Sequence, residues 1–235
     1  MAGQRPPAII LAVPSPGMWM AQTAVDAISA TVWAVAHGIY IEPRGAEGAY
    51  TESNRNNLVR AALNHPNPID AVMWLDADMR CPADTITRLW SHNKAVAGAT
   101  YRERQEPYRY LGKFSDPEDA RAEAGLHQME LMPGGMVMVR IEVYRRLPAP
   151  WYLLDEDGLR DDYYLSKTAR AAGFGVWCDM DLTRKVRHRG YQEVGWFEDG
   201  EEIARREADP RWKIFENLSL SGRAEPERRI AAAGT

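Results

Sequence analysis

The stretch Ala71-Val-Met-Trp-Leu75, followed at once by Asp76-Ala-Asp78, decides the fold. An unbroken apolar run of this length is typical of a strand that is buried on both faces, as in parallel sheets. Because the run ends in two carboxylates, we place Asp76 and Asp78 at the carboxyl end of that strand. Ligands of open α/β sheets bind outside such ends. The stretch therefore predicts both a buried strand and a candidate binding site.

Apolar runs alternate with amphipathic stretches on both sides of this strand, which predicts an α/β fold with a doubly wound mixed sheet. Pro82 opens a short helix that continues to Trp90. Further strands are expected at 8–13, 38–42, 95–101, 109–114, 128–140, 175–181 and 183–189, and Pro133-Gly134-Gly135 divides the stretch at 128–140. Further helices are expected at 19–36, 51–63, 141–146 and 161–172, with loops at 44–50, 115–125 and 151–158.

Composition indicates a globular protein. The 235 residues include 29 Lys+Arg and 33 Asp+Glu, giving a net charge of −4, which argues against a strongly basic nucleic-acid coat. Apolar residues make up 45% and charged residues 26%, close to the averages for soluble domains. We expect one domain over 1–223 with a C-terminal appendage at 191–223, and a flexible tail at 224–235.

Cysteine spacing and the absence of a long apolar segment predict a cytoplasmic location without membrane insertion. Cys81 and Cys178 form no Cys-x-x-Cys pair and no zinc-type spacing, so a reducing compartment fits best. The apolar run at 8–13 is stopped by Pro14-Ser15-Pro16. It is much shorter than the ~18 residues that a membrane span needs, and it matches a signal peptide poorly.

The pair Asp76 and Asp78 predicts a cation site. Two carboxylates this close repel one another and raise each other's pKa unless a cation lies beside them. A hard divalent ion with oxygen ligands would meet that need. The alternative is that the two acids only solvate the strand end and cap the next helix. The pattern alone leaves both interpretations open.

A second acidic pair, Asp161-Asp162, opens the helix expected at 161–172. Acids there are favoured by capping and by the helix dipole, so a plain N-cap is one interpretation. A general base at a helix N-terminus is the other. The nearby acidic segment Asp155-Glu-Asp157 is more typical of a solvated turn.

Three other positions are candidates for chemistry. His188 lies in a basic run, and strand alternation turns it away from the flanking Lys185, Arg187 and Arg189, although a lone histidine is more often a packed residue than a ligand. Gly134-Gly135 permits either close backbone approach or an ordinary turn. Arg55 lies on an expected helix and could reach a nucleotide or remain solvated. Trp151 and Tyr152 are core residues by default, although they would suit stacking on a sugar.

The order of these pieces resembles the nucleotide-sugar glycosyltransferases of the GT-A fold, particularly small inverting ones of bacteria and bacteriophages. The resemblance spans 8–190 and rests on a first strand and the segments that follow it. In chain order these are Arg55-Asn56, Asp76-x-Asp78, Gly134-Gly135, Asp161-Asp162-x-x-Leu165 and His188-x-Gly190. It implies a nucleotide-sugar-binding half over about 1–101 and an acceptor half over about 102–190.

The resemblance also implies residue roles on the donor side. Asp78 would bind Mn²⁺ or Mg²⁺ at the donor diphosphate, with His188 as a further ligand and Asp76 on the ribose or the metal waters. The nucleotide, UDP or GDP, would be lined by Pro14, Ser15 and Arg55.

On the acceptor side, Gly134 and Gly135 would border the donor sugar and the acceptor. Asp162 would be the catalytic base, with Asp161 beside it. One base opposite one metal implies a single displacement with inversion.

Two features depart from the family pattern. The usual Glu-Asp pair is Asp161-Asp162 here, which leaves the division of labour between the two acids open. The segment 192–196 is similar to an element of processive polysaccharide synthases, but Gly195 stands where that element has arginine, so we reject a processive synthase.

Other functions remain open at this point. One is a sugar nucleotidyltransferase, which would usually carry a Gly-rich basic loop after its first strand. Another is a non-catalytic nucleotide- or sugar-binding module. The sequence identifies neither the donor sugar nor the hydroxyl acceptor, for which modified DNA is one candidate, and it does not indicate the oligomeric state.

Overall fold

The computed structural model describes residues 5–15, 17–104, 110–122, 124–154, 160–189 and 193–194. They belong to a compact unit that spans Met1–Trp196. The appendage expected at 191–223, apart from 193–194, lies outside the described residues, as do the tail at 224–235, the segment 155–159 and Gly190.

A mixed sheet forms the centre of this unit, with the strand order β2-β1-β3-β8-β5-β9-β7-β6. Strand β1 pairs in parallel with β2 and β3, whereas β8 is antiparallel to both β3 and β5. The expected mixed sheet is confirmed. The strands are β1 (Ala8–Ser15), β2 (Tyr40–Glu47), β3 (Ala71–Leu75), β5 (Val96–Gly98), β6 (Lys113–Phe114), β7 (Leu126–Leu131), β8 (Met136–Arg140) and β9 (Val176–Asp179).

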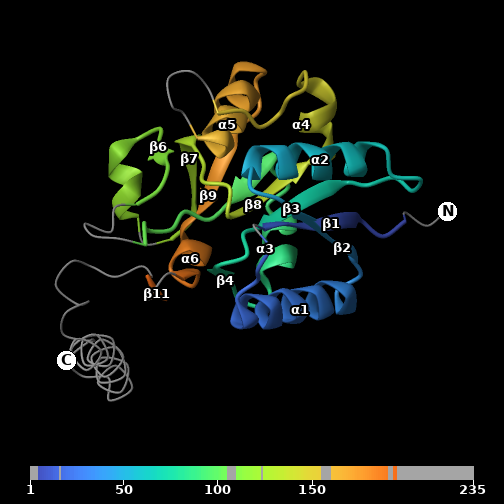
Figure 1. The fold of residues 1–235 in the computed structure, drawn as a ribbon. Coiled ribbons are helices and arrows are strands. Elements are labelled where there is room, and N and C mark those ends of the chain that lie inside the picture. Colours follow the sequence, from blue (N-terminus) through green and yellow to red (C-terminus); the bar gives the residue numbers. More distant parts are fainter. Residues whose placement is uncertain are drawn as a thin grey trace, which may run out of the picture. The chain divides into compact units, whose positions relative to one another are not determined.

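Helices cover both faces of the sheet, which confirms the doubly wound arrangement (Figure 1). One face carries α1 (Ala21–Ala36) and α3 (Thr85–Ser91). The other carries α2 (Thr51–Leu63), α4 (Ile141–Arg146) and α5 (Asp161–Ala171). A short helix α6 (Met180–Thr183) follows β9, and a 3₁₀ helix η1 (Pro117–Arg121) follows β6. None of the described helices is long and apolar enough to cross a bilayer.

Alternation along the buried strands divides the core into two layers. In β1, Ile10 packs in the layer that contains Leu58 of α2, and Ile9 packs in the layer that contains Ala30 of α1. Because successive strand residues point to opposite faces, an unbroken apolar run is needed to fill both layers. This is why the run at 71–75 appears as a fully buried β3.

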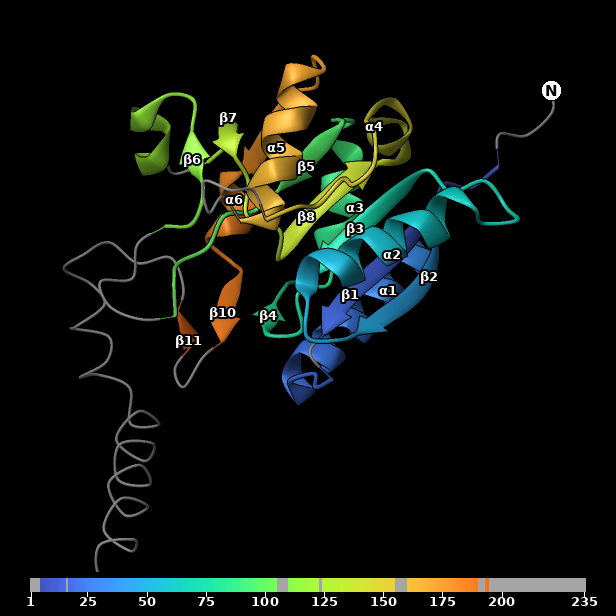
Figure 2. The ribbon, with the colours of Figure 1, turned by 45° about the horizontal axis from the view of Figure 1, so that its top comes forward.

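The reversed strand β8 brings two distant segments together. Leu75, the last residue of β3, pairs with Met136, the first residue of β8. The residues directly after β3 therefore lie beside Gly134 and Gly135, which come directly before β8. Figure 2 shows β8 running between β3 and β5.

Strand β2 is longer than expected and includes part of the predicted loop at 44–50. It contains Pro43, which lacks a backbone N–H. The strand is at the edge of the sheet and pairs only with β1, so an unpaired position there costs no ladder hydrogen bond.

The segment after β9 also differs from the expectation. The Asp179 side chain accepts a hydrogen bond from Leu182 N and caps α6, so the strands expected at 175–181 and 183–189 shorten to β9 and β10 (Arg187–Arg189). Strand β10 pairs with β4 (Met79–Arg80), which no sequence pattern indicated, and with β11 (Glu193–Val194).

Close packing of β5 against β8 predicts that Gly98 tolerates no side chain. A Cβ atom there would lie 2.5 Å from Met136 O and 3.0 Å from Val137 Cα. We expect Gly98→Ala to lower the free energy of unfolding by about 1–3 kcal/mol through overpacking, measured by urea denaturation.

The matched control is Gly45→Ala in β2, where the nearest atom to a new Cβ is Val13 O at 3.8 Å. Its unfolding free energy should stay close to that of the parent protein. Equal stability of the two variants would contradict this account of the sheet.

Candidate functional site

Arg55 of α2 connects the segments of the candidate site. Only 2% of this residue is exposed. Its Nη1 donates to the carbonyl oxygen of Gly134 at 3.0 Å, and its Nη2 donates to Asp76 Oδ1 at 2.8 Å. Its Nε lies 3.2 Å from Asp161 Oδ2. One guanidinium thereby connects α2, the end of β3, the turn before β8 and the start of α5.

Aromatic side chains lie beneath this guanidinium. Arg55 Cζ is 5.2 Å from the ring centroid of Trp74 and 5.6 Å from that of Tyr152. Trp74 Nε1 donates to the Tyr144 hydroxyl at 2.8 Å, and the hydroxyls of Tyr144 and Tyr152 are 2.7 Å apart. Trp151 and Tyr152 are buried, which confirms their default interpretation as core residues. Burial alone would lower the pKa of Arg55, but Asp76 and Asp161 raise it, so the guanidinium stays charged.

Two buried acids of the site, Asp76 and Asp162, have pKa values above their usual range. Burial raises the pKa of Asp76; Arg55 opposes this shift, and the neighbouring Asp78 adds to it. Asp162, 6% exposed, also has a raised pKa because of burial, with Arg160 and Arg55 acting in the opposite direction. Charged carboxylates at both positions are therefore less favourable than in water.

The turn at Gly134-Gly135 is clamped between these acids. Gly134 N donates to Asp162 Oδ2 at 2.8 Å, and the Gly135 carbonyl accepts from Asp76 N at 3.0 Å. A Cβ at Gly134 would lie 2.8 Å from Arg55 Nη1, and one at Gly135 would lie 2.9 Å from Asp76 Oδ2. Both positions need glycine because the surrounding buried side chains leave no room for a Cβ atom.

Asp78 and His188 form a second cluster across the strand end. Asp78 Oδ2 lies 2.8 Å from Arg104 Nη1 and 3.5 Å from His188 Nε2. Burial would raise the pKa of Asp78, but His188 and Arg104 outweigh it and the pKa is lowered. His188 Nδ1 lies 2.9 Å from the carbonyl oxygen of Arg102. Because a carbonyl only accepts, Nδ1 carries the proton, and Nε2 is the atom directed at Asp78.

Asp78 Oδ2 and His188 Nε2 are close enough together to bind one divalent cation. Two ligands on one ion with bonds of about 2.0–2.3 Å lie roughly 3 Å apart, close to the separation of Asp78 Oδ2 and His188 Nε2. The Arg104 guanidinium already places a positive charge on the same carboxylate oxygen. Within the described part of the chain, no three His, Cys, Asp or Glu residues gather as a metal cluster. Water or substrate oxygens would have to complete the coordination of an ion held by Asp78 and His188.

The end of β1 lies beside the same strand end. Pro14 and Ser15 are its last residues, and both are buried. The Ser15 hydroxyl donates to Met18 O at 2.9 Å and accepts from Gly17 N at 3.0 Å, so it stabilises the loop that follows. Met20 N donates to Ala77 O at 3.0 Å, which fastens this loop to the segment between Asp76 and Asp78.

The structure thus gathers Arg55, the acids 76, 78, 161 and 162, the glycines 134–135 and His188. It also adds residues that the sequence did not single out. The Tyr101 hydroxyl accepts from Gly135 N at 2.8 Å, and its ring centroid is 4.9 Å from that of His188. Arg160 Nε lies 3.9 Å from Asp162 Oδ1. The sequence marks Tyr101 only as the last residue of an expected strand and as an aromatic residue that is core or surface by default, and no pattern points to Arg104 or Arg160.

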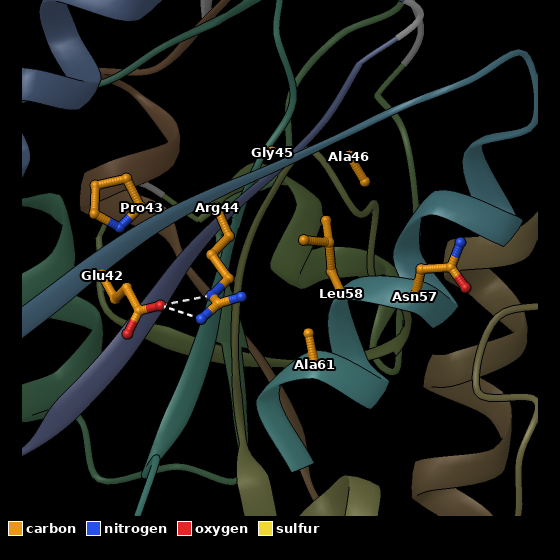
Figure 3. A pocket seen from close by; sticks show the side chains of 8 residues that line it. All are labelled: Glu42, Pro43, Arg44, Gly45, Ala46, Asn57, Leu58 and Ala61. Atoms are coloured by element: carbon orange, nitrogen blue, oxygen red, sulfur yellow. Dashed lines mark hydrogen bonds and ion pairs between the residues drawn. The ribbon is translucent and has the colours of Figure 1, made fainter. Parts of the chain in front are cut away.

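A pocket of about 440 Å³ lies elsewhere, between β2 and α2 (Figure 3). Glu42 and Arg44 pair with each other at its rim. None of the candidate site residues lines it, so we do not assign the site to this pocket. Its lining residues are Glu42, Pro43, Arg44, Gly45, Ala46, Asn57, Leu58 and Ala61.

Comparison with known proteins supports the fold. No protein-family model matches the chain, and no curated protein is significantly similar to it in sequence. The structure is similar to that of A197 from STIV, with a TM-score of 0.55 and 14% sequence identity over 82% of this chain and 95% of that one. A glycosyltransferase involved in the glycosylation of the major capsid of PBCV-1 aligns with 16% identity over 62% of this chain and 70% of that one. The TM-score of 0.34 is too low to show a shared fold. The similarity to A197 shows a shared fold.

The opposite pKa shifts of Asp162 and Asp78 predict opposite pH dependences of stability. Asp162 has a raised pKa, so its ionisation opposes folding, and this cost grows as pH rises from the ordinary value of 3.8 through the folded value. The unfolding free energy of Asp162→Asn, taken relative to that of the parent protein, should therefore increase as pH rises from acidic to neutral. Urea denaturation across that range measures the difference.

Asp78→Asn is the comparison with the reverse sign. The pKa of Asp78 is lowered, so its ionisation stabilises the fold above the ordinary value, and this contribution disappears as pH falls through the folded value. The unfolding free energy of Asp78→Asn, taken relative to that of the parent protein, should therefore decrease as pH rises. Parallel pH profiles for the two variants would contradict the assigned electrostatics.

Proposed function

We propose that the chain is a metal-dependent glycosyltransferase of the hexosyltransferase type with a GT-A-like fold. It moves a sugar from a nucleoside diphosphate sugar, UDP- or GDP-linked, to an acceptor hydroxyl with inversion. The observation that carries the proposal is the position of Arg55. Its guanidinium joins Asp76, Gly134 and Asp161 from three distant segments, which are the segments that the family resemblance marks in sequence.

The donor diphosphate is assigned to the side of Asp78 and His188. These two residues would hold Mn²⁺ or Mg²⁺, which when bound would neutralise charge on the leaving diphosphate. The contact of His188 Nδ1 with Arg102 O supports this role because it leaves Nε2 as the metal-facing nitrogen. Arg104, half exposed, would move off Asp78 when a metal binds. Asp76, held by Arg55, would contact the ribose or the metal waters.

The acceptor is assigned to the side of Asp162. Its raised pKa suits a carboxylate that must take a proton from a hydroxyl. Asp161 Oδ2 lies 3.2 Å from Arg55 Nε, so this carboxylate is already engaged by the guanidinium. In the proposed step the acceptor oxygen bonds to the anomeric carbon as its proton passes to Asp162. The bond from that carbon to the diphosphate oxygen breaks, and its electron pair leaves with the nucleoside diphosphate.

Removing the metal-side residues should abolish metal-dependent nucleotide binding. Calorimetry with UDP and GDP should show binding with Mn²⁺ that weakens in EDTA, and it should be lost in Asp78→Asn. His188→Ala should weaken Mn²⁺ binding while the circular dichroism spectrum stays unchanged. Equal affinity with Mn²⁺ and with EDTA for both nucleotides would remove the metal from the proposal.

Removing the base should affect turnover and leave nucleotide affinity intact. A positioned general base typically contributes about 10²–10⁴-fold in rate, so Asp162→Asn should lower turnover by that much. Hydrolysis or transfer of candidate nucleotide sugars provides the assay, and calorimetry provides the affinity. Asp161→Asn is the matched control one residue away. If it abolishes turnover while Asp162→Asn does not, the base is Asp161.

A further inference from the structure

Helix α1 has its small residues inside and its large apolar residues outside. The side that packs on the sheet consists of Thr23, Ala27, Ala30 and Ala34, all buried. The opposite side exposes Val25, Ile28, Val32 and Val35 by 52–64%. A helix that only covered a sheet would have the reverse arrangement, because burying a large apolar side chain stabilises a protein by about 1.5–3 kcal/mol. We call the four exposed residues the α1 face.

The spacing of the α1 face is that of a helix–helix contact. Its members recur at intervals of three, four and three residues, the pattern of the apolar seam between two packed helices. Trp33 is 43% exposed, and Met18 and Trp19 precede the helix with 80% and 40% exposed. Large contiguous apolar patches on protein surfaces mark interaction sites.

The α1 face carries no charge. Asp26 is the sole charged residue of α1, and its carboxylate accepts from Arg80 Nε and Cys81 N at 3.0 and 3.3 Å, away from the seam. The first turn of the helix has no acid and its last turn has no base. A helix that binds an anionic lipid surface carries Lys or Arg on its polar side, and α1 has neither.

An uncharged α1 face is suited to contact with the same face of a second copy of the chain. In a two-fold symmetric contact each patch meets itself, so a patch with charge of a single sign would meet the same sign on the other copy. The α1 face escapes that repulsion, and its seam offers each copy the same apolar side chains. We infer that the α1 face is the contact through which two copies of this chain associate. This inference does not depend on the proposed function.

Sedimentation of the full chain over a wide concentration range tests the inference. The parent protein should sediment as two chains. Replacing Ile28 and Val32 together by Glu should weaken the association by at least about a hundredfold, because each substitution is present in both copies and the contact would bury all of the new carboxylates. The matched control is Leu154→Glu, an apolar residue 57% exposed outside α1, which should remain dimeric. Circular dichroism should show that all variants are folded.

Mixing oppositely charged variants makes the test specific to this face. The double Glu variant and the corresponding double Lys variant should each be single chains alone and should pair when mixed. The pairing is expected whether the two helices run parallel or antiparallel, since both positions carry the same sign in each variant. A parent protein that stays a single chain at every concentration overturns the inference, even if it binds lipid vesicles. So does a dimer that survives the double Glu substitution.

Discussion

A positive charge placed among aromatic rings is stable only if negative charge surrounds it, and this constraint on Arg55 organises the whole candidate site. The desolvation of a buried ion costs several kcal/mol, and an unpaired one would unfold a marginally stable domain. Asp76 and Asp161 supply the compensating charge, and the carbonyl oxygen of Gly134 supplies a further acceptor. The strand end, the glycine turn and the start of α5 are therefore held in place by one residue that is itself almost inaccessible.

The carboxylates around this charge divide into two electrostatic environments. Asp78 lies between a histidine and a half-exposed arginine, and its pKa is lowered. Asp162 lies in a buried position against the glycine turn, and its pKa is raised. Acids whose pKa values are shifted in opposite directions within one site are a common basis for a division between charge stabilisation and proton transfer. That division is the physical reason for assigning the leaving group to one side and the acceptor to the other.

Local sequence patterns predicted most elements, because each carries its own signal. The helix bounds at 51–63 and 141–146 and the strand at 71–75 match α2, α4 and β3 residue for residue. The positions of Asp76, Gly134 and Asp162 were also found from strand ends, glycines and helix starts. Their contacts were not, because Arg55 and Gly134 are 79 residues apart. Their meeting depends on β8 entering the sheet antiparallel between β3 and β5, a choice of pairing that no local pattern encodes.

The long sequence separations around Arg55 have a consequence for how the chain folds. The guanidinium loses water as α2 packs onto β1, yet its acceptor at Gly134 and its ionic neighbour Asp161 come from much later segments. Early docking of α2 would leave the charge only partly compensated until β8 and α5 arrive. Contacts of such high sequence separation slow folding, because the entropy of loop closure is lost before the contacts form. A fragment that ends before α5 would expose an incomplete charge cluster, so the part of the site around Asp76 cannot form independently of the part that α5 supplies.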